Sequence, residues 1–215
     1  DSNFNFIKTI DIEICNNIDF KLLEDIRILK YGNVFYLSAS YPQNKVIQLC
    51  IFSMIYKNGK FITSNNFYLS RTTYNSPQKN WIPIENKPLI YIKDLKNGYL
   101  TIFDFSKQEK TINCLNMIER CGSSNLLEYK NSYIALVHKR KQFTYVYNII
   151  VLNKDFSIAK ISQNFKFFNR PVEFSCGMII DNGQIIIPST EDDKTTVFFK
   201  IDANYLLNDI LMLNV

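Results

Sequence analysis

The chain has 215 residues, of which 47% are hydrophobic and 21% are charged, and these values are ordinary for one folded domain or a tightly joined set of repeats. The net charge is +5 at pH 7, but the basic residues are scattered, so the charge favours a solvated surface over a nucleic-acid partner. No run of about 18 apolar residues is present, which argues against a membrane-spanning helix. Aromatic residues make up 14% of the chain and β-branched residues are abundant, so the composition favours strands.

The cysteine pattern argues against a metal site and for a reducing compartment. The chain has five cysteines, an odd number without a C-x-x-C pair, and only one histidine, a poor basis for a zinc site. We therefore expect no metal, free buried thiols and a cytoplasmic location. The first residues do not resemble a signal peptide. The cysteines are Cys15, Cys50, Cys114, Cys121 and Cys176.

The first predicted strands lie at 4–14, and a longer stretch from Leu23 follows, with a polar head, a turn and an alternating strand. Its turn, Tyr31-Gly32-Asn33, has three counterparts downstream, at steps of 54, 44 and 52 residues. Asn, Gly and Lys at these turns suit the positive φ angles that tight hairpins require. Each turn therefore predicts a strand–turn–strand unit. The residues equivalent to Tyr31 are Glu85, Tyr129 and Asp181.

Further apolar runs follow each turn and bring the total to about four strands per repeat. A period of roughly 50 residues with several strands per repeat is typical of a propeller blade. The main alternative is a β-sandwich, which has many strands but no such recurrence. The runs are 46–56 and 61–69 after the first turn, 98–105 and 110–117 after the second, 143–152 and 158–167 after the third, and 195–201 after the fourth.

We expect an all-β fold in which residues 1–215 form a single β-propeller domain. Four blades are readable in the sequence. The terminal segments 1–22 and 203–215 are expected to complete a further blade together, which would remove free sheet edges. The repeat units span 23–70, 78–117, 120–167 and 171–202.

The head of the first unit, Glu24-Asp25-Ile26-Arg27, is the first candidate site. In a propeller, polar residues that precede the innermost strand of a blade face the central axis. Two close carboxylates can split their pKa values and leave one as an acid and the other as a base. A nearby arginine can hold an anionic or hydroxylated ligand. The alternative interpretation is a structural salt bridge at the start of a strand.

The second and third units carry polar heads at equivalent places. Lys79 and Asn80 precede Trp81, which can stack on a sugar ring or, in the alternative interpretation, close the core of the blade. Arg120 begins the third unit, where Gly122 would let the backbone approach a ligand closely.

The remaining candidates follow in the third and fourth units. His138 is the only histidine and ends an apolar strand, where a hydrogen-bonded structural role is the alternative to a site role. Tyr147 lies on the next predicted strand. Glu173 is an acid in an otherwise apolar run, so it must be paired or lie at a wet site. Asp192 and Asp193 belong to an acidic loop whose alternative interpretation is a solvated surface.

Taken in order, these motifs resemble those of a known family, the five-bladed β-propellers of glycoside hydrolase family 130. That family contains mannoside phosphorylases and hydrolases, and similar propeller domains accompany bacterial glycosyltransferases. The resemblance covers roughly residues 20–202. The motifs that carry it are Leu23-Glu-Asp-Ile-Arg27, Gln78-Lys-Asn-Trp-Ile-Pro83, Arg120-Cys-Gly-Ser123, Val137-His138 and Val172-Glu-Phe-Ser-Cys-Gly177.

The chain departs from the family pattern at several positions. Ile26 stands where the first motif has a proline, and Cys121 and Ser123 replace residues of an Arg-Gly-Gly-Thr motif. The strand end Tyr91-Ile-Lys-Asp-Leu-Lys96 lacks the family's histidine. The resemblance nevertheless implies a set of substrate- or anion-binding residues: Arg27, Lys79, Asn80, Trp81, Arg120, His138, Asp192 and Asp193. Tyr147 is a further candidate because of its place on the strand after His138.

The resemblance implies a carbohydrate-active protein, and two functions stay open. The first is an enzyme that cleaves a mannoside-like glycosidic bond with inversion, in which Glu24 or Asp25 protonates the leaving oxygen. If water attacks, Glu173 is the expected base; if inorganic phosphate is a co-substrate, its cradle is expected from Arg27, Lys79, Arg120 and His138. We expect no other cofactor. The second function is a non-catalytic glycan-binding or scaffold propeller, attached to or serving a glycosyltransferase.

Overall fold

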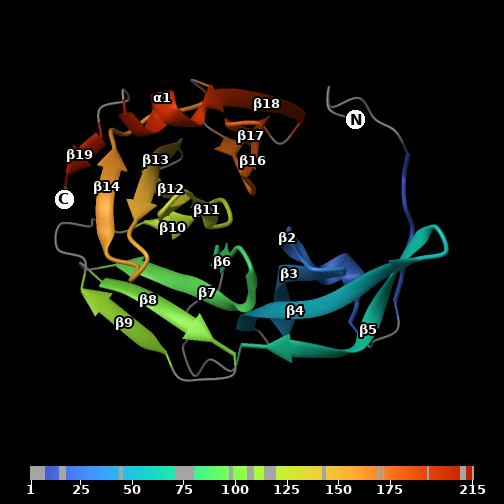
Figure 1. Ribbon diagram of the computed structural model, residues 1–215. Coiled ribbons are helices and arrows are strands. Elements are labelled where there is room, and N and C mark those ends of the chain that lie inside the picture. Colours follow the sequence, from blue (N-terminus) through green and yellow to red (C-terminus); the bar gives the residue numbers. More distant parts are fainter. Residues whose placement is uncertain are drawn as a thin grey trace. The chain divides into compact units, whose positions relative to one another are not determined.

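In the computed structural model the described residues are 8–14, 18–43, 46–70, 80–96, 99–105, 109–113, 120–141, 144–168, 170, 172–192, 194–208 and 212–214. The chain divides into two compact units, residues 1–77 and 78–215. The described strands form four sheets, one in the first unit and three in the second (Figure 1). They follow one another along the chain as the four predicted repeats do. The extent of a single domain over the whole chain stays a prediction.

The first unit holds one sheet in the order β1-β5-β4-β3-β2. Neighbouring strands are antiparallel except β1 and β5, which run parallel. A short 3-10 helix, Phe20–Leu22, precedes β2 and is capped by the Asp19 side chain, which accepts from the Lys21 N–H. The strands are β1 (Ile12–Glu13), β2 (Glu24–Tyr31), β3 (Val34–Gln43), β4 (Val46–Lys57) and β5 (Lys60–Leu69).

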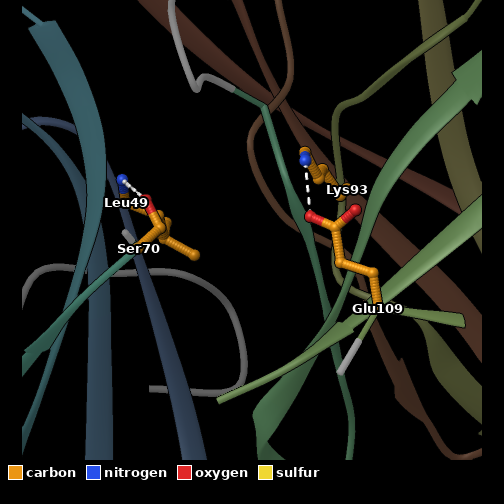
Figure 2. Close-up of polar contacts among 4 residues, drawn as sticks. All are labelled: Leu49, Ser70, Lys93 and Glu109. Carbon is orange, nitrogen blue, oxygen red and sulfur yellow. Dashed lines mark hydrogen bonds and ion pairs between the residues drawn. The ribbon is translucent and has the colours of Figure 1, made fainter. Parts of the chain in front are cut away.

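The end of this sheet is fixed by Ser70. Its N–H donates to the carbonyl oxygen of Leu49, and its Oγ accepts from the N–H of Leu49, both at 2.9 Å (Figure 2). Both residues are buried, so these two bonds satisfy polar groups that water cannot reach. The core on one face of the sheet consists of Ile18, Leu37, Ala39, Cys50, Phe52 and Met54.

The described residues of the second unit form three sheets and one α-helix. The second sheet contains β6 (Ile82–Ile84), β7 (Lys87–Lys96), β8 (Tyr99–Asp104) and β9 (Lys110–Asn113). The third contains β10 (Cys121–Gly122), β11 (Leu127–Tyr129), β12 (Ser132–Lys141), β13 (Thr144–Leu152), β14 (Ile158–Ser162) and β19 (Met212–Asn214). The fourth contains β15 (Glu173–Phe174), β16 (Ile179–Asp181), β17 (Gln184–Glu191) and β18 (Thr195–Asp202), after which helix α1 (Ala203–Asn208) follows.

The three sheets of the second unit share two hydrophobic cores. One core joins the second and third sheets and includes Ile92, Leu100, Val137 and Ile150. The other joins the third and fourth sheets with helix α1 and includes Tyr147, Ile185 and Leu206. Backbone hydrogen bonds reinforce the first junction, since the N–H of Leu126 donates to Pro83 and the N–H of Arg120 donates to Leu95. These contacts hold the sheets of the second unit in place relative to one another, and so fix the positions of the polar residues on them.

The four predicted hairpin turns are present at the expected positions. Gly32, Asn86, Lys130, Asn182 and Gly183 all have positive φ angles, between +48° and +77°. Antiparallel pairing begins directly on both sides of each turn, for example Tyr31 with Val34 and Asp181 with Gln184. The local chemistry of Asn, Gly and Lys therefore fixes the register of each hairpin.

The strand that leads into each predicted hairpin turn, here called the first strand of its blade, is irregular near its beginning: it is shifted in register, preceded by a residue with a positive φ angle, or split in two. In β2 the register shifts between Glu24 and Arg27, and Asp25 has a φ of +54°. Before β6, Asn80 has a φ of +61°. In the third sheet the first strand is split into β10 and β11, which both pair with β12, and in the fourth sheet it is split into β15 and β16, which both pair with β17. Each interruption falls on a segment that the sequence marks as a candidate site.

The described strands belong to an all-β chain of the β-propeller class with four blades, and a β-sandwich would have two sheets instead. The further blade expected from the two termini is not found among the described strands. β1 pairs with β5 of the first sheet, and β19 pairs with β14 of the third. Each terminal strand therefore covers an edge that would otherwise be open. The described part of the chain contains no helix long and apolar enough to cross a membrane.

Candidate functional site

Arg120 is the centre of a buried polar network in the second unit. Its Nε donates to Asn148 Oδ1 at 2.8 Å, and its Nη2 donates to Asn164 Oδ1 at 3.3 Å. The side chain is 8% exposed. Burial lowers the pKa of the guanidinium from its usual value, yet an arginine stays protonated at neutral pH. The site therefore holds a fixed positive charge directed at two amide oxygens.

The network extends from Asn148 across two strands of the third sheet. Asn148 Nδ2 donates to the carbonyl oxygen of Ser162 at 2.9 Å. Ser162 Oγ accepts from the N–H of Ile149 at 2.8 Å and donates to the carbonyl oxygen of Gln163 at 2.9 Å. Sequence reasoning missed Asn148, Ser162 and Asn164. Asn148 could have been found, because it is the one amide within the apolar run of β13 and a buried amide needs partners.

His138 is a buried, hydrogen-bonded residue of the third sheet. Its Nδ1 lies 2.6 Å from Ser123 Oγ, and 3% of its surface is exposed. The imidazole ring packs edge-on against Tyr145 and Phe174, with centroid distances of 5.3 and 5.8 Å. This arrangement matches the structural interpretation of the histidine, and its role in binding a ligand stays a prediction.

Glu173 begins the first strand of the fourth sheet and is fully buried. Its Oε1 accepts from the N–H of Phe167 at 3.3 Å and its Oε2 from the N–H of Phe168 at 2.6 Å. The carbonyl oxygen of the same residue accepts from the Tyr147 hydroxyl at 2.9 Å. Burial raises the pKa of the Glu173 carboxyl, although the two N–H donors oppose this shift. Burial and the charge of Glu173 also raise the pKa of Tyr147.

Two polar atoms in these segments have no hydrogen-bond partner among the described residues. They are Asn80 Oδ1, in the segment before β6, and Ser175 Oγ, in the interruption between β15 and β16. An unpaired buried acceptor or hydroxyl is unfavourable, so such atoms mark places where a structure can receive a ligand or a water. Asn80 also has a φ of +61°, a left-handed conformation that asparagine tolerates better than most other side chains.

Gly122 allows a close approach within the protein instead of the expected approach to a ligand. Its N–H donates to the carbonyl oxygen of Asn80 at 3.0 Å. A Cβ atom at this position would lie 2.4 Å from that oxygen and 2.4 Å from Ile82 Cγ1. The glycine is therefore required for packing between the second and third sheets.

Trp81 offers no ring face to a ligand in this structure, because it is 3% exposed. Its ring packs edge-on against Phe103 with a centroid distance of 5.0 Å. Lys93 Nζ lies 5.8 Å from the centroid of the Trp81 ring. The same ammonium group forms an ion pair with Glu109 at 2.6 Å (Figure 2). The core interpretation of Trp81 is the one that the structure matches.

The candidate residues of the first unit lie at the interruption of β2. Glu24 is exposed, Asp25 is half-buried and Arg27 is 7% exposed. Because the register shifts between them, Glu24 pairs with Ser40 and Arg27 with Ser38 on the neighbouring strand. The positive φ of Asp25 turns its backbone out of the regular pleat.

The remaining predictions concern the acidic loop, one lysine and the cysteines. Asp192 is exposed, has a φ of +50°, and donates its N–H to Val172 at 2.9 Å. Lys79 and Asp193 lie outside the described residues. The expectation of buried thiols is correct for Cys50, whose pKa burial raises to about 12. It is wrong for Cys121 and Cys176, which are exposed because they lie in the interrupted first strands.

The structure thus brings together two groups of the predicted residues in the second unit. Arg120 is surrounded by amides from β13 and the segment after β14. His138 and Tyr147 lie 6.2 Å apart between ring centroids, and Tyr147 is bonded to Glu173. These groups are preorganised and largely closed to solvent, so they can position neighbouring backbone and side chains with little motion.

Stability should fall with rising pH because of Glu173. The raised pKa means that the folded chain binds this proton more tightly than the unfolded chain. Its contribution is therefore fully present below the unfolded value of about 4.3 and is lost as pH rises through the folded value. Glu173→Gln does not titrate and should lack this decline.

The comparison requires urea midpoints of both proteins from about pH 4 to about pH 8. Glu128→Gln, which alters an exposed glutamate on β11, controls for the change of side chain. Parallel curves for the parent chain and Glu173→Gln would show that Glu173 titrates normally.

With this geometry defined, the chain can be compared with known proteins. No protein-family model matches it, and no curated protein does. Its fold is similar to that of the beta-1,2-mannobiose phosphorylase from Listeria innocua, with 12% identity, a TM-score of 0.63, and coverage of 87% of this chain and 60% of that one.

Two further solved structures are similar, both from Bacteroides ovatus. A glycosyl hydrolase has 8% identity and a TM-score of 0.55, over 85% of this chain and 65% of that one. A putative glycoside hydrolase from strain ATCC 8483 has 10% identity and a TM-score of 0.56, over 86% of this chain and 72% of that one. At such identities the likeness establishes the fold alone. This chain spans less than two thirds of the length of the first two structures.

Proposed function

We propose that this protein is a carbohydrate-active β-propeller that binds an oligosaccharide at the interrupted beginnings of its first strands. One observation carries the proposal: each interruption coincides with polar residues that the sequence marks as a candidate site. In β2 of the first unit these are Glu24, Asp25 and Arg27. In the second unit, taken by itself, Asn80 precedes β6 and Arg120 precedes β10.

An interruption suits a binding site for a physical reason. A regular strand alternates its side chains between two packed faces, whereas a bulge or a split strand turns a side chain out of that alternation. Hydroxyl-rich sugars are recognised by charged and amide side chains that hold fixed orientations, and the Arg120 network is an example of such rigidity. The fold shared with a mannobiose phosphorylase and two glycoside hydrolases supports carbohydrate as the ligand class.

Binding without cleavage is favoured over hydrolysis by the burial and the hydrogen bonds of Glu173. A catalytic base must reach a water molecule near the substrate, but this carboxylate is fully buried and both its oxygens accept backbone N–H groups. The binding function would serve a glycosyltransferase as an attached or associated domain. That partner and a cytoplasmic location are proposed, and neither follows from the fold.

Cleavage is the second candidate, and the conformation of Asp25 favours it. A half-buried acid held at a positive φ carries backbone strain, and such strain clusters at functional sites. In this candidate Asp25 protonates the leaving oxygen of a mannoside-like substrate and inorganic phosphate or water attacks. Arg27 is the proposed contact to the phosphate.

The test is calorimetric titration with manno-oligosaccharides, followed by incubation with and without inorganic phosphate. We expect saturable binding, and if cleavage occurs, Asp25→Asn should reduce the rate by about a hundredfold or more, since it removes the proton donor. Asp181→Asn is the matched control, because Asp181 is exposed on β16 beside a hairpin turn. Absence of binding to any manno-oligosaccharide would refute both candidates.

A further inference from the structure

A pocket of about 320 Å³ lies in the second unit, among the third sheet, the fourth sheet and helix α1. Its floor is apolar and comes from three elements: Ile149 of β13, Ile201 of β18 and Leu206 of α1. The segment directly after β14 completes the lining with Gln163, Asn164 and Phe165, and these three residues are called the rim below. The volume lies within the range of small-molecule sites and is many times the roughly 30 Å³ that one water molecule occupies.

Asn164, one of the rim residues, holds its amide oxygen towards Arg120 and keeps its amide nitrogen as a hydrogen-bond donor. Because arginine can only donate, the atom of Asn164 that faces Arg120 must be the oxygen, and Oδ1 accepts from Nη2 at 3.3 Å. The Asn164 Nδ2 group is therefore left as a donor for a ligand. No bond of the Asn164 Nδ2 group or of the Gln163 side chain is found among the described residues, and both side chains are exposed.

The remaining polar group of the lining does not compete for a ligand. Ser162 Oγ already accepts from Ile149 and donates to Gln163, so it holds the rim segment in place. None of the described residues that line the pocket carries a charge. A strongly charged ligand would lose its hydration without gaining a counter-charge from the lining.

We propose that this pocket binds a small neutral molecule with a compact apolar body and one hydrogen-bond acceptor, such as a hydroxyl or carbonyl oxygen. The apolar body contacts Ile149, Ile201 and Leu206, and the acceptor takes a hydrogen bond from Asn164 Nδ2. The site goes beyond the proposed saccharide function, because its floor has no polar groups to match the hydroxyls of a sugar. Asn164 connects it to Arg120, one of the candidate saccharide contacts.

Benzyl alcohol is a suitable probe, and toluene is its matched counterpart without an acceptor. In methyl NMR spectra, benzyl alcohol should shift the signals of Ile149, Ile201 and Leu206 saturably, with a dissociation constant of about 1 mM or lower. Toluene should bind about fivefold more weakly, which is the usual contribution of one hydrogen bond. Asn164→Asp keeps an oxygen towards Arg120 but removes the donor, so it should abolish the preference for the alcohol.

A filled pocket provides the second arm of the test. Ile201→Phe places a ring in the pocket and should abolish the shifts at Ile149 and Leu206. Ile179→Phe makes the same change on β16, where the side chain is 53% exposed and outside the pocket, and should leave binding intact.

Three outcomes would overturn the proposal: no shifts at the floor residues of the parent chain, binding unaffected by Ile201→Phe, or an alcohol preference that survives Asn164→Asp. If Ile201→Phe does not fold, the shift map of the parent chain and the Asn164→Asp comparison still decide the question. Saccharide titration of Ile201→Phe separates this site from the proposed function, because Ile201 lines the pocket and is not among the candidate saccharide contacts.

Discussion

Gly122→Ala is expected to lower the free energy of unfolding of the second unit by about 3 kcal/mol or more. The added Cβ would lie 2.4 Å from the carbonyl oxygen of Asn80, which is backbone and cannot rotate away. The clash can be removed only if β10 or the segment before β6 moves. Such a movement would break the hydrogen bond from the N–H of Gly122 to the carbonyl oxygen of Asn80. Overpacking and the loss of a buried hydrogen bond then act together.

Trp81 provides the measurement, because it is the only tryptophan and lies in the core beside Asn80. Its fluorescence should report unfolding of the second sheet in urea, with the midpoint of Gly122→Ala clearly reduced. Gly177→Ala is the matched control: it lies in the equivalent interruption of the fourth sheet, and its nearest contact would be an ordinary 3.8 Å to Pro188. Equal midpoints for the two variants would contradict the close approach at Gly122.

Arg120→Met should destabilise the second unit by about 2–3 kcal/mol. Methionine approximates the length of arginine but cannot donate, so the Oδ1 atom of Asn148 loses its partner in a residue that is 3% exposed. An unsatisfied buried acceptor is more unfavourable than the loss of the bond alone.

A double variant distinguishes this mechanism from a simple packing defect. Arg120→Met combined with Asn148→Leu removes both partners, so it should be less destabilised than Arg120→Met alone. Arg140→Met, an exposed position on β12, is the control and should change the urea midpoint little. If the double variant is as unstable as the sum of the single variants, the network around Arg120 is not energetically coupled.

The hairpins and the order of the blades could be predicted because their signals are local. Two or three residues determine each turn: Asn182 and Gly183 take positive φ angles whatever lies elsewhere in the chain. Recurrence of that signal at about 50 residues then indicates the repeat. The polar segments at the beginnings of the first strands were also predictable, because polar residues are easily recognised within otherwise apolar runs.

The partners of the polar residues could not be predicted because they are distant in sequence. Arg120 meets Asn148 and Asn164 across 28 and 44 positions, and no pattern in either segment specifies the other. Glu173 illustrates the same limit. Its position in an apolar run required a partner, but both partners are backbone N–H groups that the identity of Phe167 and Phe168 does not reveal.

Two further outcomes depended on contacts between distant parts of the chain, namely side-chain packing in one case and strand pairing in the other. Trp81 had two interpretations, a core residue and a stacking face for a sugar, and its packing against Phe103 matches the first. The terminal strands were expected to pair with each other, but edges of existing sheets compete for any free strand, and β1 and β19 each pair with such an edge.

The return of β19 to the third sheet has a consequence for how the protein comes apart. After the fourth sheet is complete, the chain passes through α1 and adds β19 to β14 (Figure 1). The fourth sheet is thus connected covalently to the third at both of its ends, before β15 and after β18. The fourth sheet therefore cannot detach as a free terminal segment. We expect the third and fourth sheets to open together, so that their protected amide hydrogens exchange with the same free energy of opening.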